Sequence, residues 1–386
     1  MPTGVIFLVV LSVLVLVHEL GHFLAARILK IKVEEFALGL PLTPPVFKIK
    51  RGDTRYAVYP ILFGGFVRLY GEDTKIQSDK VTKNKDVGKD FWSRGKKQRL
   101  AVIAAGVVMN MVLALGLFVL VYAVAGVPVS TENKVTVVGV EPGSPAEIAG
   151  IRVEDRITQV EGRNINTTEE FSLAVKAWAG LGVNLMVERG SGTILFEGIV
   201  EGESENSVVN VIPRTEPPAG QGAVGVVITT YPYVRTDKCS MLSIRCAVGA
   251  VTQGTKSTRA WVGRVGEGLR QIGRSLFAGK APEGVSGPVG IYQLTGEVAK
   301  QGWLPLLELV AILSVNLGVF NVLPVPALDG GRMLFIWLEW ATKRRIKPEI
   351  EQRINSWGIA FLLGVMVLIS FQDVIRLGVI QRLLGE

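Results

Sequence analysis

Four apolar stretches organise the chain, at about residues 4–28, 100–126, 303–323 and 357–369. A helix needs roughly 20 mostly apolar residues to cross the hydrocarbon core of a bilayer. The pattern therefore predicts a polytopic α-helical membrane protein with about four transmembrane helices. The first stretch has no charged segment before it and no small-residue cleavage pattern after it, which favours a retained span over a secretory signal.

The segment between the first two spans alternates apolar and polar residues at 46–50 and again at 54–59, around the turn-like Arg51-Gly52-Asp53. This period of two predicts a membrane-associated β-hairpin; an ordinary cytoplasmic loop is the alternative. The pair Gly64-Gly65 indicates a position where the backbone approaches another group closely. A charged stretch at 72–99 is expected to form a loop.

A soluble α+β domain is predicted between the second and third spans. Residues 133–214 contain short strands and turn residues, including Gly139-Val140-Glu141-Pro142-Gly143-Ser144-Pro145-Ala146 and Asp155-Arg156-Ile157. These turns bring strands to a helix at Pro145, which is typical of a bacterial-type PDZ domain; an unrelated small β-rich domain is the alternative. A groove between a strand and a helix binds an extended peptide as an added strand, so peptide termini are the expected ligands.

The expected organisation has four parts. Residues 1–126 hold the first two spans and the hairpin, 127–216 the PDZ domain, 217–302 a linker, and 303–386 the last two spans. Within the linker, residues 258–277 separate apolar from basic side chains at helical period. Such a helix lies on a membrane surface or packs against the soluble domain, and the sequence leaves both open.

Charge placement orients the chain in the membrane. The net charge is +8 and the mean hydropathy is positive. Residues 27–99 carry 17 Lys and Arg against 8 Asp and Glu, and 340–354 carry 5 against 2, whereas 127–302 carry 17 against 18. Cytoplasmic loops are rich in Lys and Arg, so the PDZ domain is predicted to be extracytoplasmic. Topology and anionic lipid explain the basic excess, and no nucleic-acid partner is expected.

The sequence His18-Glu19-Leu20-Gly21-His22 supplies the only two histidines of the chain. Four residues apart on a helix, they share one face. This is the H-E-x-x-H arrangement, in which two imidazoles bind Zn²⁺ and the glutamate acts as general base toward a water activated by the metal. Histidines that only fill a core or an interface are the alternative, but ionisable residues inside a span are costly and usually functional.

A catalytic zinc normally has three protein ligands. No third histidine exists and both cysteines fall in the outer segment, so a carboxylate at membrane depth is expected. The candidates are Glu308, Asp329, Glu339 and Asp373. Glu308 and Asp373 fall near outer ends of spans and Glu339 beside the basic loop. Asp329 matches the depth of the histidines and follows two helix-breaking prolines; a simple Asp-Gly turn is its alternative.

Two further features concern single polar or small residues. Asn110 lies within the second span and either bonds a neighbouring helix or takes a role near the metal. Cys239 and Cys246 would be about 10 Å apart on one helix, which is too far for an unstrained disulfide. They are therefore interpreted as incidental small residues.

Taken together, these motifs resemble the site-2 proteases, a family of intramembrane zinc metalloproteases, and the bacterial RseP-type branch most. The resemblance covers nearly the whole length and rests on four segments: His18–His22, Gly64–Arg68, Ser286–Gly290 and the N-x-x-P-x-P-x-L-D-G sequence Asn321–Gly330. One PDZ phrase is found where several relatives carry two.

The resemblance implies that His18, His22 and Asp329 bind Zn²⁺, with Glu19 as the catalytic base. It also implies that Asn321 helps to hold the substrate or the transition state. The hairpin segment, with its residues Gly64, Gly65 and Phe66, would pair with the substrate as an extra strand.

The expected function is zinc-dependent cleavage of transmembrane segments of single-span proteins in a bacterial inner (plasma) membrane, with the active site toward the cytoplasm. The substrates implied by the resemblance are anti-sigma-factor-like proteins or remnant signal peptides. A catalytically inactive PDZ-containing scaffold is the alternative, and the intact set of His18, Glu19, His22 and Asp329 argues against it. A metal transporter would need several ligand sets along a path, and the sequence shows one.

Overall fold

The structure is a computed structural model that describes residues 2–62, 64–71, 89–218, 220–237, 243–278 and 287–376. The chain divides into two compact units, one made of Met1–Val119 with Gly254–Glu386 and the other of Leu120–Gln253. Residues 72–88 of the expected charged loop lie outside the described residues, as do Cys239 and Ser286.

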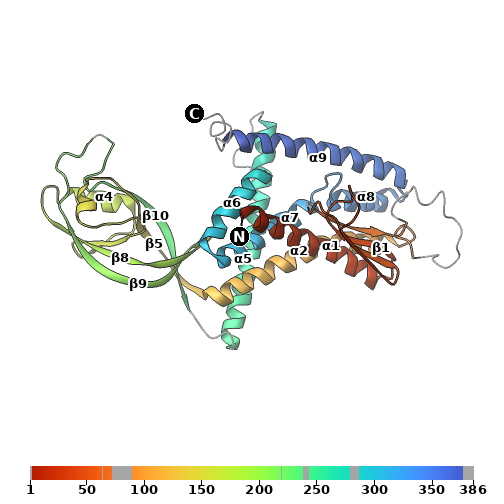
Figure 1. Ribbon diagram of the computed structural model, residues 1–386, viewed down its shortest axis with the longest axis horizontal. Coiled ribbons are helices and arrows are strands. Elements are labelled where there is room, and N and C mark those ends of the chain that lie inside the picture. Colours follow the sequence, from red (N-terminus) through yellow and green to blue (C-terminus); the bar gives the residue numbers. More distant parts are fainter. Residues whose placement is uncertain are drawn as a thin grey trace. The chain divides into compact units, whose positions relative to one another are not determined.

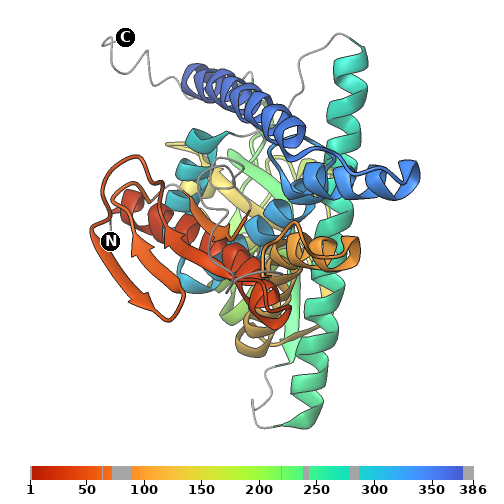
Figure 2. The same cartoon turned by 90° about the vertical axis from the view of Figure 1, so that its right-hand side faces the viewer.

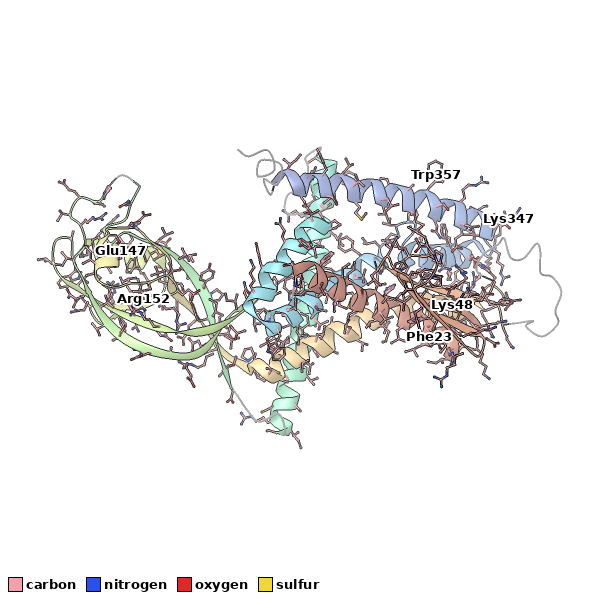
Figure 3. The ribbon with its side chains drawn as sticks, viewed as in Figure 1. Phe23, Lys48, Glu147, Arg152, Lys347 and Trp357 are labelled. Atoms are coloured by element: carbon pink, nitrogen blue, oxygen red, sulfur yellow. The ribbon has the colours of Figure 1, made fainter. Side chains whose placement is uncertain are left out.

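Four described helices are long and apolar enough to cross a membrane: α1 (Thr3–Ile28), α2 (Lys96–Ala125), α7 (Trp303–Val322) and α9 (Pro348–Arg376). Their positions agree with the four predicted spans. α9 exposes most of its apolar side chains, including Trp357 (Figure 3). A helix that is apolar on its outer surface is the form that lipid, rather than water, surrounds.

A non-helical segment separates α7 from α8 (Asp329–Thr342), as the two prolines predict. Glycines let α8 begin against this segment. A Cβ on Gly330 would lie 2.1 Å from the carbonyl oxygen of Leu323, and one on Gly331 2.4 Å from that of Val325. A larger residue at either position would push the start of α8, and Asp329 with it, away from the end of α7.

A helix that the sequence pattern did not indicate, α6 (Pro288–Gln301), packs against α1, α7 and α9 (Figure 1, Figure 2). Its N-terminus is capped by Asp373 of α9, whose Oδ2 accepts hydrogen bonds from the backbone N–H groups of Gly287 at 2.8 Å and Gly290 at 3.0 Å. The carboxylate of Asp373 thus satisfies helix-end donors.

Glu339, which the sequence places beside the basic loop, is buried. It is 2% exposed and pairs with Arg99 of α2, which is 1% exposed. Its other oxygen accepts a hydrogen bond from the backbone of Ile346 at 3.1 Å. The contact connects the C-terminal end of α8 to the first turn of α2. Local sequence patterns do not predict it, because the two residues are far apart in the chain.

A four-stranded sheet follows α1, in the order β2 (Phe47–Arg51), β3 (Thr54–Val58), β1 (Val33–Leu38) and β4 (Gly65–Leu69). β2 and β3 form the predicted hairpin, with Phe47 opposite Val58 and Arg51 opposite Thr54. β1 pairs parallel to β3 and antiparallel to β4. β4 is therefore an edge strand of the described sheet.

The second unit contains a β domain with strands in the order β5 (Val127–Val140), β10 (Val226–Asp237), β9 (Gly198–Val211), β8 (Val183–Leu195), β6 (Arg156–Val160) and β7 (Arg163–Asn164). β5 also pairs with β6, which closes five strands into a ring. Two helices, α3 (Pro145–Ile148) and α4 (Thr168–Lys176), begin at side-chain caps from Ser144 and Thr167. The sheet runs on to Asp237, beyond the expected boundary at residue 216.

Besides an apolar core, this domain has a cluster of charged residues drawn from several strands. Lys134 of β5 lies 2.8 Å from Glu188 of β8 and 2.5 Å from Glu201 of β9, and Arg156 of β6 pairs with Glu188 at 3.1 Å. Burial alone would raise the pKa of Glu188, but hydrogen bonds from Lys134 and Ser204 outweigh it and hold that pKa below its usual value.

The predicted amphipathic helix is α5, which runs from Ile244 to Phe277. Cys246 lies in its first turn and is disulfide-bonded, and no described cysteine is free. The interpretation of the cysteines as incidental small residues is therefore wrong. It assumed one helix through both positions, whereas α5 begins only at Ile244.

Candidate metal centre

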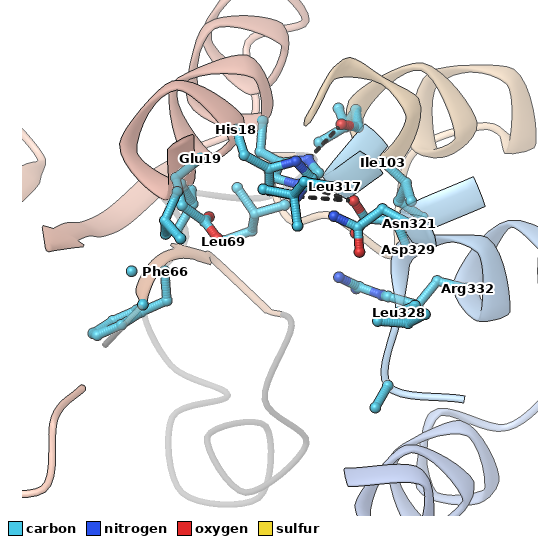
Figure 4. Close-up of a pocket in the computed structure, with 17 residues that line it drawn as sticks. His18, Glu19, Phe66, Leu69, Ile103, Leu317, Asn321, Leu328, Asp329 and Arg332 are labelled. Carbon is cyan, nitrogen blue, oxygen red and sulfur yellow. Dashed lines mark hydrogen bonds and ion pairs between the residues drawn. The ribbon is translucent and has the colours of Figure 1, made fainter. Parts of the chain in front are cut away.

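Three ligand atoms from two distant parts of the chain converge at one point (Figure 4). α1 presents His18 and His22, whose Nε2 atoms lie 3.2 Å apart. The Oδ2 atom of Asp329, the first residue of α8, lies 3.1 Å from the first of these and 3.3 Å from the second. The helical spacing of four and the break before α8 are the two sequence features that produce this triangle.

The triangle fits a tetrahedral zinc ion. Bonds of about 2.0–2.1 Å at tetrahedral angles place neighbouring ligand atoms about 3.3 Å apart, close to the three distances observed. Apart from the two histidines, Asp329 Oδ2 has no hydrogen-bond partner among the described residues, although it is buried. A buried anionic oxygen facing two imidazole nitrogens is a donor set that a divalent cation satisfies.

The far side of each imidazole ring is fixed by α2. His22 Nδ1 lies 2.9 Å from the carbonyl oxygen of Val102 and donates to it, which leaves Nε2 free for a metal. His18 Nδ1 lies 3.1 Å from the side-chain nitrogen of Asn110, whose buried Oδ1 has no hydrogen-bond partner within the described parts of the chain. A 180° rotation of the Asn110 side-chain amide would let its Oδ1 accept the Nδ1–H of His18, which leaves His18 Nε2 free for a metal in the same way.

Two glycines allow α1 and α2 to approach at the histidines. A Cβ on Gly21 would lie 2.3 Å from the carbonyl oxygen of Ala105. On the opposite helix, a Cβ on Gly106 would lie 2.5 Å from His22 Nε2 and 2.7 Å from His18 Cε1. The second glycine therefore leaves the space in which the two rings meet.

A cavity of about 390 Å³ opens beside the triangle. Glu19 of α1, Asn321 of α7 and Arg332 of α8 line it together with the three ligand residues. In Figure 4 the side chains of Asn321 and Arg332 point to the same side as Asp329. Arg332 also pairs with Glu351 at 3.5 Å, and neither residue of this ion pair was among the predicted site residues.

Strand β4 and the glycine before it form another wall of the cavity, through Gly64, Gly65, Phe66, Val67 and Leu69. The backbone N–H of Gly39 donates to the oxygen of Gly64 at 2.8 Å. Hydrogen-bonded pairs alternate in an antiparallel ladder, so Gly65 and Val67 direct their backbone N–H and C=O groups away from β1. A Cβ on Gly65 would lie 3.4 Å from Cγ of Glu19, so this strand runs directly past the glutamate.

The sheet behind β4 is held by a buried charge. Glu35 of β1 is 2% exposed, accepts a hydrogen bond from the Tyr59 hydroxyl at 2.9 Å and pairs with Arg68 at 3.4 Å. Burial and this bond to the carboxylate raise the pKa of Tyr59. The cluster stabilises the strand that lines the cavity.

The structure thus brings the expected residues His18, Glu19, His22, Asp329 and Asn321 to one cavity, with Gly64, Gly65 and Phe66 on its wall. Both alternatives for Asn110 stay open: its side chain contacts His18 of the neighbouring helix α1, which is also a proposed ligand, and its backbone oxygen accepts a hydrogen bond from Ser314 of α7 at 2.8 Å. Gly106 was missed, although its place four residues before Asn110, one helical turn away, was a usable signal.

Comparison with known proteins agrees with this chemistry. Residues 6–365 match Peptidase family M50. A Clostridium perfringens protein named as a zinc metalloprotease is 33% identical over 374 residues, with 95% of this chain and 97% of the relative covered. Zinc metalloprotease RasP of Oceanobacillus iheyensis is 29% identical, with 98% and 100% covered. Regulator of sigma-W protease RasP of Bacillus subtilis is 26% identical, with 97% and 99% covered.

These matches extend over nearly the whole chain and include the helices that carry the triangle. Four apolar helices and this family together make the chain a multi-pass membrane protein of bacteria. Its enzyme class is that of a metalloprotease, and its cofactor is zinc. The chain belongs to Peptidase family M50, the site-2 proteases, and to their RseP-type branch.

Proposed function

We propose that this chain hydrolyses peptide bonds within transmembrane segments, using zinc held by His18, His22 and Asp329. The observation that carries the proposal is the triangle of ligand atoms beside Glu19, in a cavity between helices apolar enough to cross a membrane. The charges also balance. A Zn²⁺ ion with ionised Asp329 and Glu19 sums to zero, which reduces the cost of placing ions at membrane depth.

Each residue then has a distinct role. When bound, zinc supplies Lewis-acid polarisation of the scissile carbonyl and lowers the pKa of a water to about 7. Glu19 accepts the proton of that water and passes it to the leaving amine. Asn321, on the opposite wall, donates its amide hydrogens to the substrate carbonyl and stabilises the negative charge that develops there.

The substrate is proposed to lie along β4 as an added strand. A transmembrane helix hides its peptide bonds in its own hydrogen bonds and must unwind locally before it is cut. The outward N–H and C=O groups of Gly65 and Val67 would replace the hydrogen bonds lost in the apolar surroundings. Because a Cβ on Gly65 would lie within van der Waals distance of Glu19, a peptide on this edge would lie near the general base.

Substrates would be single-span membrane proteins, of the anti-sigma-factor or remnant signal-peptide class. The relative named as a regulator of sigma-W protease supports the first of these. The β domain is proposed to be an extracytoplasmic PDZ domain that binds peptide termini between β10 and α4, which are in contact. The basic segments 27–99 and 340–354 would place the catalytic side toward the cytoplasm.

The test is cleavage in liposomes of a tagged single-span protein, with mass spectrometry of the products and a zinc assay. Wild type should cut inside the apolar segment. Glu19→Gln should retain zinc and cut nothing, while the control Glu203→Gln, at an exposed glutamate of β9, should behave as wild type. Equal cleavage by Glu19→Gln, or cuts confined to the soluble flanks, would refute the proposal. A folded chain without zinc or cleavage would favour a scaffold.

A further inference from the structure

The turn between β8 and β9 has an unusual composition. Leu195 pairs with Gly198, so the turn consists of Phe196 and Glu197 alone. Two-residue hairpin turns normally contain Gly, Asn or Asp. Here a phenylalanine stands at the tip and is 42% exposed, and Ile194 on the same face of β8 is 48% exposed, while Leu195 between them is buried.

This tip is fixed beside the end of an apolar helix. Glu197 accepts a hydrogen bond from the Tyr122 hydroxyl at 2.9 Å, and Tyr122 is 4% exposed in the last turn of α2. A second bond holds β10 to the same helix end, because Thr236 donates to the carbonyl oxygen of Ala125 at 2.9 Å. Both contacts lie within the second unit and connect strands to the last residues of a membrane-spanning helix.

The depth of the tip follows from the depth of that helix end. Residues 100–125 of α2 carry no charge, so the hydrocarbon boundary falls near its last turn. Tyrosine is enriched at this level because its ring is apolar and its hydroxyl reaches the polar zone. A turn that is hydrogen-bonded to Tyr122 lies at the same level. Val129, four residues after α2, is 68% exposed and adds to the apolar surface there.

We propose that Ile194 and Phe196 insert into the boundary between lipid headgroups and acyl chains, as a membrane anchor of the β domain. Its partner is the bilayer surface itself, because the tip is continuous with the emerging end of a span. Scattered exposed apolar residues need no explanation, and the domain has others, such as Leu173 of α4, which is 70% exposed. The difference is that the tip is hydrogen-bonded to the last turn of α2.

The anchor contributes an apolar contact that does not depend on charge. Aromatic and aliphatic side chains at this level bind neutral and anionic lipid alike, whereas basic surfaces prefer anionic lipid. The base of the β domain would thus remain at the bilayer surface at any ionic strength.

The experiment uses the full chain in liposomes of neutral phosphatidylcholine. Phe196→Cys and Ile194→Cys are labelled with a polarity-sensitive dye without reductant, so that Cys246 stays in its disulfide. Leu173→Cys, at an exposed apolar position of the same domain, is the control. Near-identical thermal unfolding of the three variants establishes that they are folded.

The dye at 194 and 196 should emit at shorter wavelength than at 173, and lipids spin-labelled near the headgroup should quench it only at the tip. High salt should leave both effects unchanged. Emission typical of water, without quenching, at 194 and 196 of folded protein would overturn the anchor. If a tip substitution prevents folding, the dye is attached at Val129→Cys on the adjoining surface. Blue-shifted emission with quenching there supports the anchor, and emission typical of water without quenching overturns it.

Discussion

Gly106 is the position at which a single methyl group should strongly weaken zinc binding. A Cβ there would lie 2.5 Å from His22 Nε2 and 2.7 Å from His18 Cε1. Ordinary contacts are about 3.5 Å or longer, so the rings must move by about 1 Å. Ligand distances tolerate only about 0.2 Å. Changes to groups that merely orient ligands already cost about 10–100-fold in affinity, so Gly106→Ala should lose at least that much.

The matched control lies on the same helix. A Cβ on Gly116 of α2 would meet no heavy atom within 4 Å, and alanine is the better helix former by about 0.5–1 kcal/mol. Zinc per chain should be measured after dialysis against a series of buffered zinc concentrations, with thermal unfolding of each variant in detergent. We expect Gly116→Ala to match wild type and Gly106→Ala to fold but bind zinc weakly. Wild-type zinc affinity in Gly106→Ala would show that the metal is not bound between these rings.

Three more outcomes follow from the geometry. Asn110→Leu removes the amide beside His18 and should weaken zinc binding about 10–100-fold. Asn110→Asp keeps a hydrogen-bond acceptor there and should retain most of the wild-type zinc affinity. Equal zinc affinities in Asn110→Leu and wild type would refute a role of Asn110 in orienting His18. Gly65→Val should slow cleavage with zinc content unchanged, since a Cβ at this position would lie 2.9 Å from the carbonyl oxygen of Ala37 and 3.4 Å from Cγ of Glu19 and must push β4 away from the glutamate; unchanged cleavage would contradict a substrate that lies along β4 beside Glu19. The pKa of Glu188 is lower in the fold than its usual 4.5, so its stabilising effect is complete above about pH 4.5 and is lost as the pH falls further. Glu188→Gln should therefore lower the free energy of unfolding of the β domain at pH 7 by roughly 1–3 kcal/mol, for the lost bonds to Lys134, and flatten the acid dependence of its stability; an unaltered pH profile would contradict this.

Features encoded in short segments could be predicted from the sequence. The spacing of His18 and His22 gives one helical face, and apolar runs give the four spans. The prolines near 324 give the break that brings Asp329 to the ligand triangle. Elimination among buried carboxylates identified Asp329 because the chain is poor in alternatives.

Features that depend on distant contacts could not be predicted. β1 is recognisable as a strand only through its partners β3 and β4, which come later in the chain. The buried pair of Arg99 and Glu339 joins residues 240 apart in sequence. The role of Gly106 follows from two rings on another helix.

The most direct test of the central claim is X-ray absorption at the zinc edge on purified protein. The account predicts one zinc per chain, with two imidazole nitrogens and carboxylate oxygen at about 2.0–2.2 Å and no sulfur. Asp329→Ala should lose the ion or the carboxylate contribution. Zinc bound through sulfur at about 2.3 Å, or a spectrum unchanged in Asp329→Ala, would contradict the assignment of this metal centre.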